Sequence, residues 1–172
     1  MTPPSIRIVQ LDPATLQALA DGDAERARAT SPVELTDWLA GPECRRTWQY
    51  RAPQVVANPD DLDWVTGVIW DDDAQRAVGK AGFHAAPDED GMVEVGYAVD
   101  PAHRRRGYAR AALDAMIARA RQEPRATRLL ASISPDNEAS LHLIAHHPFA
   151  QVGEQWDDED GLELVYELDV SR

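Results

Sequence analysis

The sequence predicts one α+β domain in which helices flank a mixed, mostly antiparallel sheet of about seven strands. Three observations carry this prediction. The 172 residues have the length of a single domain, which we expect to span residues 1–172. Segments rich in β-branched and aromatic residues alternate with short acidic runs that are typical of hairpin turns. One long segment, residues 107–122, instead repeats its apolar residues at helical spacing.

Each element follows from its local pattern. In residues 107–122, alanine, leucine, methionine and isoleucine recur on one helical face, and Pro124 ends the helix. The short helix within 134–147 is preceded by residues that favour helix caps. The other expected elements are a strand at 5–11, helical stretches at 13–20 and 33–51, and strands at 62–70, 76–85, 92–99, 127–133, 149–156 and 162–170.

Composition excludes several functional classes. The formal net charge of −13 disfavours nonspecific binding to nucleic acid or to an anionic membrane, because both present phosphates that a basic surface must neutralise. No apolar run approaches the roughly 18 to 20 residues that span a bilayer, and no secretory signal is visible, so we expect a cytoplasmic protein. The single cysteine, Cys44, cannot form an internal disulfide and is expected to be structural.

Most of the acidic residues lie in three runs, at 71–73, 88–90 and 157–160. Solvated hairpin loops are one interpretation of these runs. The other is a rim that attracts a cationic substrate. Both interpretations stay open at this point.

Four arginines, Arg104, Arg105, Arg106 and Arg110, occur within seven positions that contain no acidic residue. They follow a strand and a proline-containing turn, at the expected start of the long helix. The first amides of a helix have no intrahelical partner and lie at the positive end of its dipole, so they favour anions. Gly107 would let a phosphate approach the backbone. The sequence therefore predicts a phosphate-bearing ligand here, the alternative being a solvated basic helix turn.

The pattern Arg104-x-x-Gly107-x-Ala109, after a strand ending in GYAVDP, resembles the acetyl-coenzyme A (acetyl-CoA) signature of the GNAT superfamily of N-acetyltransferases. A second motif of that family consists of an Asn, a small residue, a Leu and an aromatic residue. Its positions are matched in order and spacing by Asn137, Ser140, Leu143 and Phe149. The resemblance covers residues 63–168, and the C-terminal segment resembles the branch of ribosomal-protein alanine acetyltransferases.

This resemblance implies a GNAT-like sheet with a splay between the fourth and fifth strands, which admits the pantetheine arm of the cofactor. It also implies that the backbone amides of residues 105–109 hold the pyrophosphate, with arginine side chains assisting. Asn137 would meet the pantetheine from the other side, although a helix cap is an equal alternative for it. The cofactor-binding residues implied in this way are Tyr97, Val99, Arg104, Arg105, Arg106, Gly107, Tyr108, Ala109, Asn137 and Ser140.

Acetyl transfer to an amine requires a neutral amine, so a base or a water relay must take its proton. Glu94, on the strand before the arginines, is the candidate catalytic base, and a cross-strand or solvent-facing carboxylate is the alternative. Many relatives carry a Tyr as the acid for the departing thiolate, but the matching position here is Ile144. His142 or Ser140 could replace that acid.

No metal cofactor is expected. His142 and His146 have the i, i+4 spacing of two metal ligands, but the sequence offers no third ligand on that helix.

Two functions remain open from the sequence. The favoured one is an acetyl-CoA-dependent N-acetyltransferase that acts on a primary amine of a small molecule or of a protein N-terminus. The alternative is a noncatalytic module that binds or senses acyl-CoA. The expected partners are acetyl-CoA and an amine acceptor, for which a cationic molecule is one option. A homodimer is left open, and no nucleic-acid or membrane partner is expected.

Overall fold

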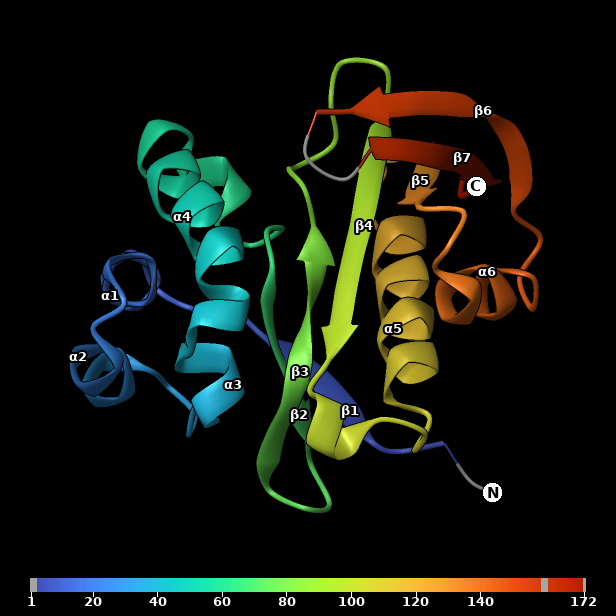
Figure 1. Cartoon of the computed structure of the whole chain (residues 1–172). Coiled ribbons are helices and arrows are strands. Elements are labelled where there is room, and N and C mark those ends of the chain that lie inside the picture. The colour runs from blue at the N-terminus through green and yellow to red at the C-terminus, as the bar shows by residue number, and fades with distance from the viewer. Residues whose placement is uncertain (1–2, 159–160, 172) are drawn as a thin grey trace. The chain divides into compact units, whose positions relative to one another are not determined.

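A computed structural model describes residues 3–158 and 161–171 (Figure 1). The helices are α1 (Pro13–Asp21), α2 (Ala24–Thr30), α3 (Asp37–Ala40), α4 (Pro42–Ala57), α5 (Tyr108–Gln122) and α6 (Glu138–Ile144), with 3₁₀ turns η1 (Pro59–Asp61) and η2 (Pro101–His103). The strands are β1 (Ile6–Val9), β2 (Gly67–Asp71), β3 (Arg76–Phe83), β4 (Met92–Val99), β5 (Arg128–Ile133), β6 (Ala150–Asp157) and β7 (Gly161–Asp169).

These strands form a mixed sheet in the order β1-β2-β3-β4-β5-β7-β6. The neighbours β1 and β2, β2 and β3, β5 and β7, and β7 and β6 pair antiparallel. β4 and β5 pair parallel, with Met92–Glu94 opposite Arg128–Leu130. The predicted α+β class with a mixed, mostly antiparallel sheet is confirmed. The expected splay further along β4 and β5 stays a prediction.

The chain divides into two compact units. The first consists of Met1–Ala86 and Gly96–Ala115, and the second of Pro87–Val95 and Met116–Arg172. Both β4 and α5 begin in one unit and end in the other. The interpretation of residues 1–172 as a single domain stays a prediction.

The core of the first unit lies between its N-terminal helices and β2 and β3. α1 lies beside α2 and α4, and α3 lies beside α4 (Figure 1). Leu16 and Leu19 of α1 and Trp48 of α4 are fully buried in one cluster with Val68 of β2. The Trp48 indole N–H donates to the backbone oxygen of Leu39 at 2.8 Å, so this large ring is buried with its polar atom paired.

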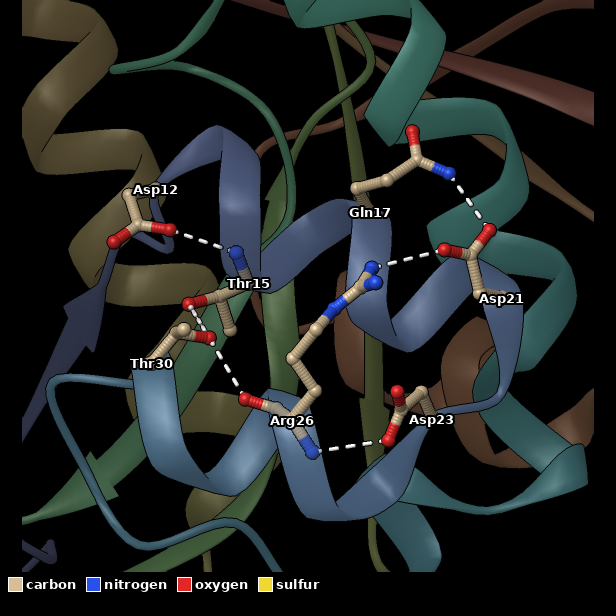
Figure 2. A network of polar contacts seen from close by, with 7 residues as sticks. All are labelled: Asp12, Thr15, Gln17, Asp21, Asp23, Arg26 and Thr30. Carbon is tan, nitrogen blue, oxygen red and sulfur yellow. Dashed lines mark hydrogen bonds and ion pairs between the residues drawn. The ribbon is translucent and has the colours of Figure 1, made fainter.

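The helix α2 was missed by sequence analysis. Its sequence AERARAT buries one residue, Ala27, and so it lacks an apolar stripe. Polar contacts hold it instead (Figure 2): the Asp23 carboxylate caps its first turn by accepting from the Arg26 amide at 3.0 Å. The Arg26 guanidinium also lies 2.9 Å from Asp21 at the end of α1, and the Thr15 hydroxyl is 2.9 Å from that of Thr30.

The expected helical stretch at 33–51 is divided by Gly41 into α3 and α4, as the GPE interruption indicated, and α4 continues to Ala57. The strand expected at 62–70 begins at Gly67 and extends to Asp71. The remaining expected elements are confirmed with small shifts of their ends.

In the second unit, the alternation of β5 buries Leu129, Ala131 and Ile133 on one face of the sheet. The C-terminal half of α5 contributes the buried side chains of Met116 and Ala120. β6 and β7 form a hairpin (Figure 1), and β6 is exposed along nearly its whole length.

Within residues 3–158 and 161–171, no helix has the length and the hydropathy that a bilayer-spanning helix needs.

Candidate active site

The turn after β4 is fixed by Asp100, whose side chain is buried. Its amide donates to the Val78 oxygen of β3 at 2.9 Å, and its carboxylate accepts from the Ala102 amide at 2.9 Å, which caps η2. The arginine segment therefore starts from a turn that is bonded to the sheet of the first unit.

The arginine segment itself, residues 104–107, is exposed and contains two residues with positive φ. Arg105 has φ of 63° and Gly107 has φ of 85°. In proteins generally, a right-handed residue followed by a left-handed one directs successive N–H groups toward one side, which forms a concave site for anions. The Gly107 oxygen accepts from the Ala111 amide at 3.0 Å, which is the first helical hydrogen bond of α5. Two positive φ values therefore lie directly before the first turn of α5.

Any side chain at position 107 would be disfavoured. A Cβ there would come within 3.3 Å of Cδ of Pro4, and a positive φ strains residues other than glycine.

One arginine of the segment has a defined contact within the first unit. Arg104 Nε donates to the Val99 oxygen at 3.2 Å, which holds its side chain beside the end of β4. Arg110 lies in the first turn of α5, with its Nε 4.0 Å from Asp114 Oδ2. Arg105 and Arg106 are exposed.

Tyr108, the first residue of α5, is buried and its hydroxyl donates to Asp71 Oδ2 at 2.5 Å. Burial raises the pKa of Asp71, but bonds from Tyr108 and from the Ala74 and Asp73 amides more than offset this and hold the pKa below its ordinary value. Burial, and then the bond to Asp71, raise the pKa of Tyr108. The Tyr108 side chain therefore anchors the start of α5, which leaves its backbone amide as the group that could bind phosphate.

Two further residues expected on the cofactor, Tyr97 and Val99, lie on the C-terminal half of β4 in the first unit. Both are partly exposed, and the alternation of the strand places them on the same face. Ala109, at the start of α5, is also partly exposed.

Glu94, Asn137 and Ser140 belong to the second unit. Glu94 is half-buried, and its Oε1 accepts a hydrogen bond of 2.6 Å from the hydroxyl of Ser132 on β5. Gln155 of β6 in turn donates to the Ser132 hydroxyl at 3.1 Å. Glu94 is thus a carboxylate that is hydrogen-bonded to the neighbouring strand, as the cross-strand alternative expects. Its role as the catalytic base stays a prediction.

Asn137 caps α6. Its Oδ1 accepts from the Ser140 amide at 3.1 Å, so the capping alternative is confirmed. A contact of either residue with pantetheine stays a prediction.

Ile144, at the position of the family's Tyr, is 2% exposed and belongs to the packed interior of its unit. His142 and His146 lie on the exposed side of the same segment, with ring centroids 4.8 Å apart. In the part of the chain that the structure describes, no three side chains of the metal-binding types gather into a group.

Cys44 is fully buried, and this burial raises the pKa of its thiol to about 11. A thiol of this kind is protonated and unreactive at neutral pH, so the structural role expected from the sequence is confirmed.

The polar network at the end of β3 was missed by sequence analysis. Arg51 and Gln54 of α4 both donate to the His84 oxygen, at 3.0 and 2.7 Å. The buried Asp61 accepts from the Ala86 amide at 2.9 Å and from Gln54 at 2.7 Å. Only the helical spacing of Arg51 and Gln54 could have indicated a shared face, because their partners are distant in sequence.

Comparison with known proteins identifies the family. Residues 8–149 match the model of the acetyltransferase (GNAT) domain. The N-acetyltransferase YjdG of Bacillus subtilis (strain 168) is 37% identical over 103 residues, which are 56% of this chain and 61% of that protein. The chain thus spans less than two thirds of the length of this relative.

Solved structures share the fold. A chimera of the spermidine N-acetyltransferase SpeG from Vibrio cholerae and hSSAT has a TM-score of 0.67 at 10% identity, over 96% of this chain and 95% of its own. The ribosomal L7/L12 alpha-N-protein acetyltransferase RimL has a TM-score of 0.66 at 14% identity, over 99% and 98% of the two chains. The domain match, which covers most of the chain, shows that this protein belongs to the GNAT family of acetyltransferases.

Proposed function

We propose that this protein transfers the acetyl group of acetyl-CoA to a primary amine. The observation that carries the proposal is the backbone of residues 105–107, where two positive φ values precede the start of α5 within the family's cofactor signature. In this proposal the amides of residues 105–109 bind the pyrophosphate, and the exposed arginines add positive charge in a chain that is otherwise acidic. Tyr97, Val99, Asn137 and Ser140 are proposed to line the pantetheine arm.

The chemistry needs few side chains. Acetyl-CoA supplies an activated thioester, and a neutral amine attacks its carbonyl carbon as the carbon–sulfur bond breaks. Glu94 is the proposed base that accepts the ammonium proton. Strand amides could stabilise negative charge on the thioester oxygen. A thiol has a pKa near 8.5, so the thiolate can depart unprotonated at a modest cost, and the absence of a Tyr at Ile144 is compatible with turnover.

Gly107→Glu tests the cofactor site. The variant introduces a carboxylate and a strained residue into the proposed cradle, so we expect CoA affinity to fall by about two orders of magnitude or more. Calorimetry with CoA measures the effect, and circular dichroism checks the fold. Gly153→Glu adds the same side chain on β6, where a Cβ meets no atom within 4 Å, and serves as the charge control. An unchanged affinity in a folded Gly107→Glu variant would remove the proposal.

The acceptor is proposed to be cationic. The net charge of −13 would attract such a molecule, and spermidine is the substrate named for a structural neighbour. A protein N-terminus is the alternative, in line with the name of RimL. A panel of polyamines, small amines and N-terminal peptides, with release of free thiol as the readout, would separate the two classes.

A noncatalytic acyl-CoA module is the second candidate, and the buried Ile144 in place of the family's acid favours it. It predicts CoA binding without thiol release in the presence of any amine of the panel. A cytoplasmic location and a homodimer remain predictions of the sequence.

A further inference from the structure

A chain of hydrogen-bonded side chains crosses the sheet of the second unit, from Glu94 on β4 through Ser132 on β5 and Gln155 on β6 to Glu163 on β7. The Ser132 hydroxyl donates to Glu94 Oε1 at 2.6 Å. Gln155 Nε2 lies 3.1 Å from the Ser132 hydroxyl and 2.9 Å from Glu163 Oε2. One amide nitrogen therefore joins the hydroxyl to the second carboxylate.

The chemistry of these groups fixes the direction of the bonds. An ionised carboxylate only accepts, so the Gln155 group beside Glu163 must be its NH₂ and not its oxygen. This NH₂ has two protons, one for Glu163 and one for the Ser132 oxygen. Because the Ser132 oxygen accepts from Gln155, its own single proton is left for Glu94. Gln155 thus donates to the Ser132 oxygen, and the Ser132 hydroxyl donates to Glu94.

Strand register brings these residues to one face of the sheet. Gln155 and Glu163 are direct partners between β6 and β7, and Ser132 pairs with Val165 of β7. Glu94 pairs with Leu130, two residues before Ser132 on the same face of β5. The other charged side chains of the second unit on this face of these strands are Arg128, Asp157, Glu167 and Asp169, and the Arg128 guanidinium lies 3.5 Å from Glu167.

We propose that Ser132 and Gln155 are positioning residues for Glu94, which they hold in one orientation and in its charged form. This inference rests on the proposed function, in which Glu94 is the base. A hydrogen bond to the charged form of an acid favours that form, and an oriented carboxylate collects a proton from a defined direction. When the amine attacks, its proton passes to the Glu94 carboxylate while the bond from Ser132 to Oε1 is kept.

A double-mutant cycle tests whether Ser132 acts through Glu94. We expect Ser132→Ala to lower kcat by about tenfold with little change in the KM for the acceptor. In the Glu94→Gln background the same change should have almost no further effect, because the group that it positions is already gone. Ser132→Thr keeps the hydroxyl and should retain near-parental kcat. Gln155→Leu should give a smaller loss, about threefold, since it removes the donor behind Ser132.

The control is Glu154→Gln on β6. Glu154 is next to Gln155 in the strand, so its side chain points to the opposite face of the sheet. It should leave kcat unchanged. Equal losses from Ser132→Ala in the parent and in the Glu94→Gln background would overturn the inference, as would a normal kcat in Ser132→Ala. A parental kcat in Glu94→Gln would show that Glu94 is not the base, and the inference would fall with that assignment.

A second measurement does not depend on turnover. Carbon NMR of the side-chain carboxyls, with Glu94 assigned from the Glu94→Gln spectrum, gives the pKa of Glu94. Loss of the donor should raise this pKa in Ser132→Ala and leave it unchanged in Glu154→Gln. An unshifted pKa would contradict the inference. If the parent transfers acetyl to no amine, the proposed function fails, while this titration still decides whether Ser132 stabilises the charged carboxylate.

Discussion

Two acidic runs that look alike in the sequence, at 71–73 and 88–90, have different roles in the structure. Each begins with an aspartate whose Oδ1 closes its own turn. Asp71 accepts from the amides of Asp73 and Ala74 at 2.9 and 2.8 Å, and Asp88 accepts from those of Asp90 and Met92 at the same two distances. Asp71, however, is the last residue of β2 and is buried, and its second oxygen accepts from Tyr108.

This difference shows that a turn-forming aspartate can also fix a distant element. Asp88 is exposed and closes only its own turn. Asp71 does the same and, in addition, holds the first residue of the helix that follows the arginine segment. The interpretation of the runs as solvated loops is therefore wrong for Asp71, while Asp73 and residues 88–90 are exposed as expected.

Removing each aspartate would show the largest contrast. Asp71→Ala should lower the free energy of unfolding by about 2 to 3 kcal/mol, because it leaves a buried phenol without its acceptor and frees two turn amides. Asp88→Ala should cost about 1 kcal/mol or less, since water can replace the lost bonds. Urea unfolding of the two variants measures the contrast. Equal losses would show that the bond to Tyr108 contributes nothing to stability.

The dependence of stability on pH should also show the contribution of the Asp71 carboxylate. The pKa of Asp71 is lower in the folded state than the value of about 3.9 expected for the unfolded chain. Its contribution to stability is therefore present above that pH and is lost as the pH falls through the folded pKa. The stability difference between the parent and Asp71→Asn should shrink in this acidic range. Urea midpoints at a series of pH values below about 6 provide the test, and a constant difference would contradict it.

The Tyr108 hydroxyl should have a smaller effect than the Asp71 carboxylate. Tyr108→Phe keeps the buried ring and leaves Asp71 with its two turn amides, so we expect a loss of about 1 kcal/mol in the free energy of unfolding. Its proposed phosphate contact is through the backbone, so CoA affinity should stay within about threefold of the parent. Tyr50→Phe, at a residue that is 55% exposed, is the matched control and should change stability by at most about 0.5 kcal/mol. A large loss of CoA affinity in Tyr108→Phe would give the hydroxyl a direct role in the cofactor site.

The sequence predicted well those features that local patterns determine. Strand alternation and helical spacing placed β3, β4 and α5 within a few residues, and the glycine and arginines at 104–107 marked the segment where the structure has two positive φ values. Burial of Asp71 and the path from Glu94 to Gln155 could not be predicted in this way. Both depend on contacts between residues 23 to 38 positions apart. Strand register brings Glu94, Ser132 and Gln155 together, and the packing of α5 brings Tyr108 to Asp71; local sequence patterns reveal neither.

The smallest effect is expected from the exposed members of the second run. Combining Glu89→Gln with Asp90→Asn should change the free energy of unfolding by at most about 0.5 kcal/mol, because both side chains are exposed. If this run attracts a cationic acceptor, the KM for a polyamine should rise by about twofold at low salt, and the KM for a singly charged amine should rise less. The difference should vanish at about 1 M salt, where the Debye length falls to about 3 Å. If the KM for a polyamine is the same in parent and variant at low salt, residues 88–90 do not attract the acceptor. Their role is then limited to the turn that Asp88 closes. The contrast with Asp71 would then be one of burial alone.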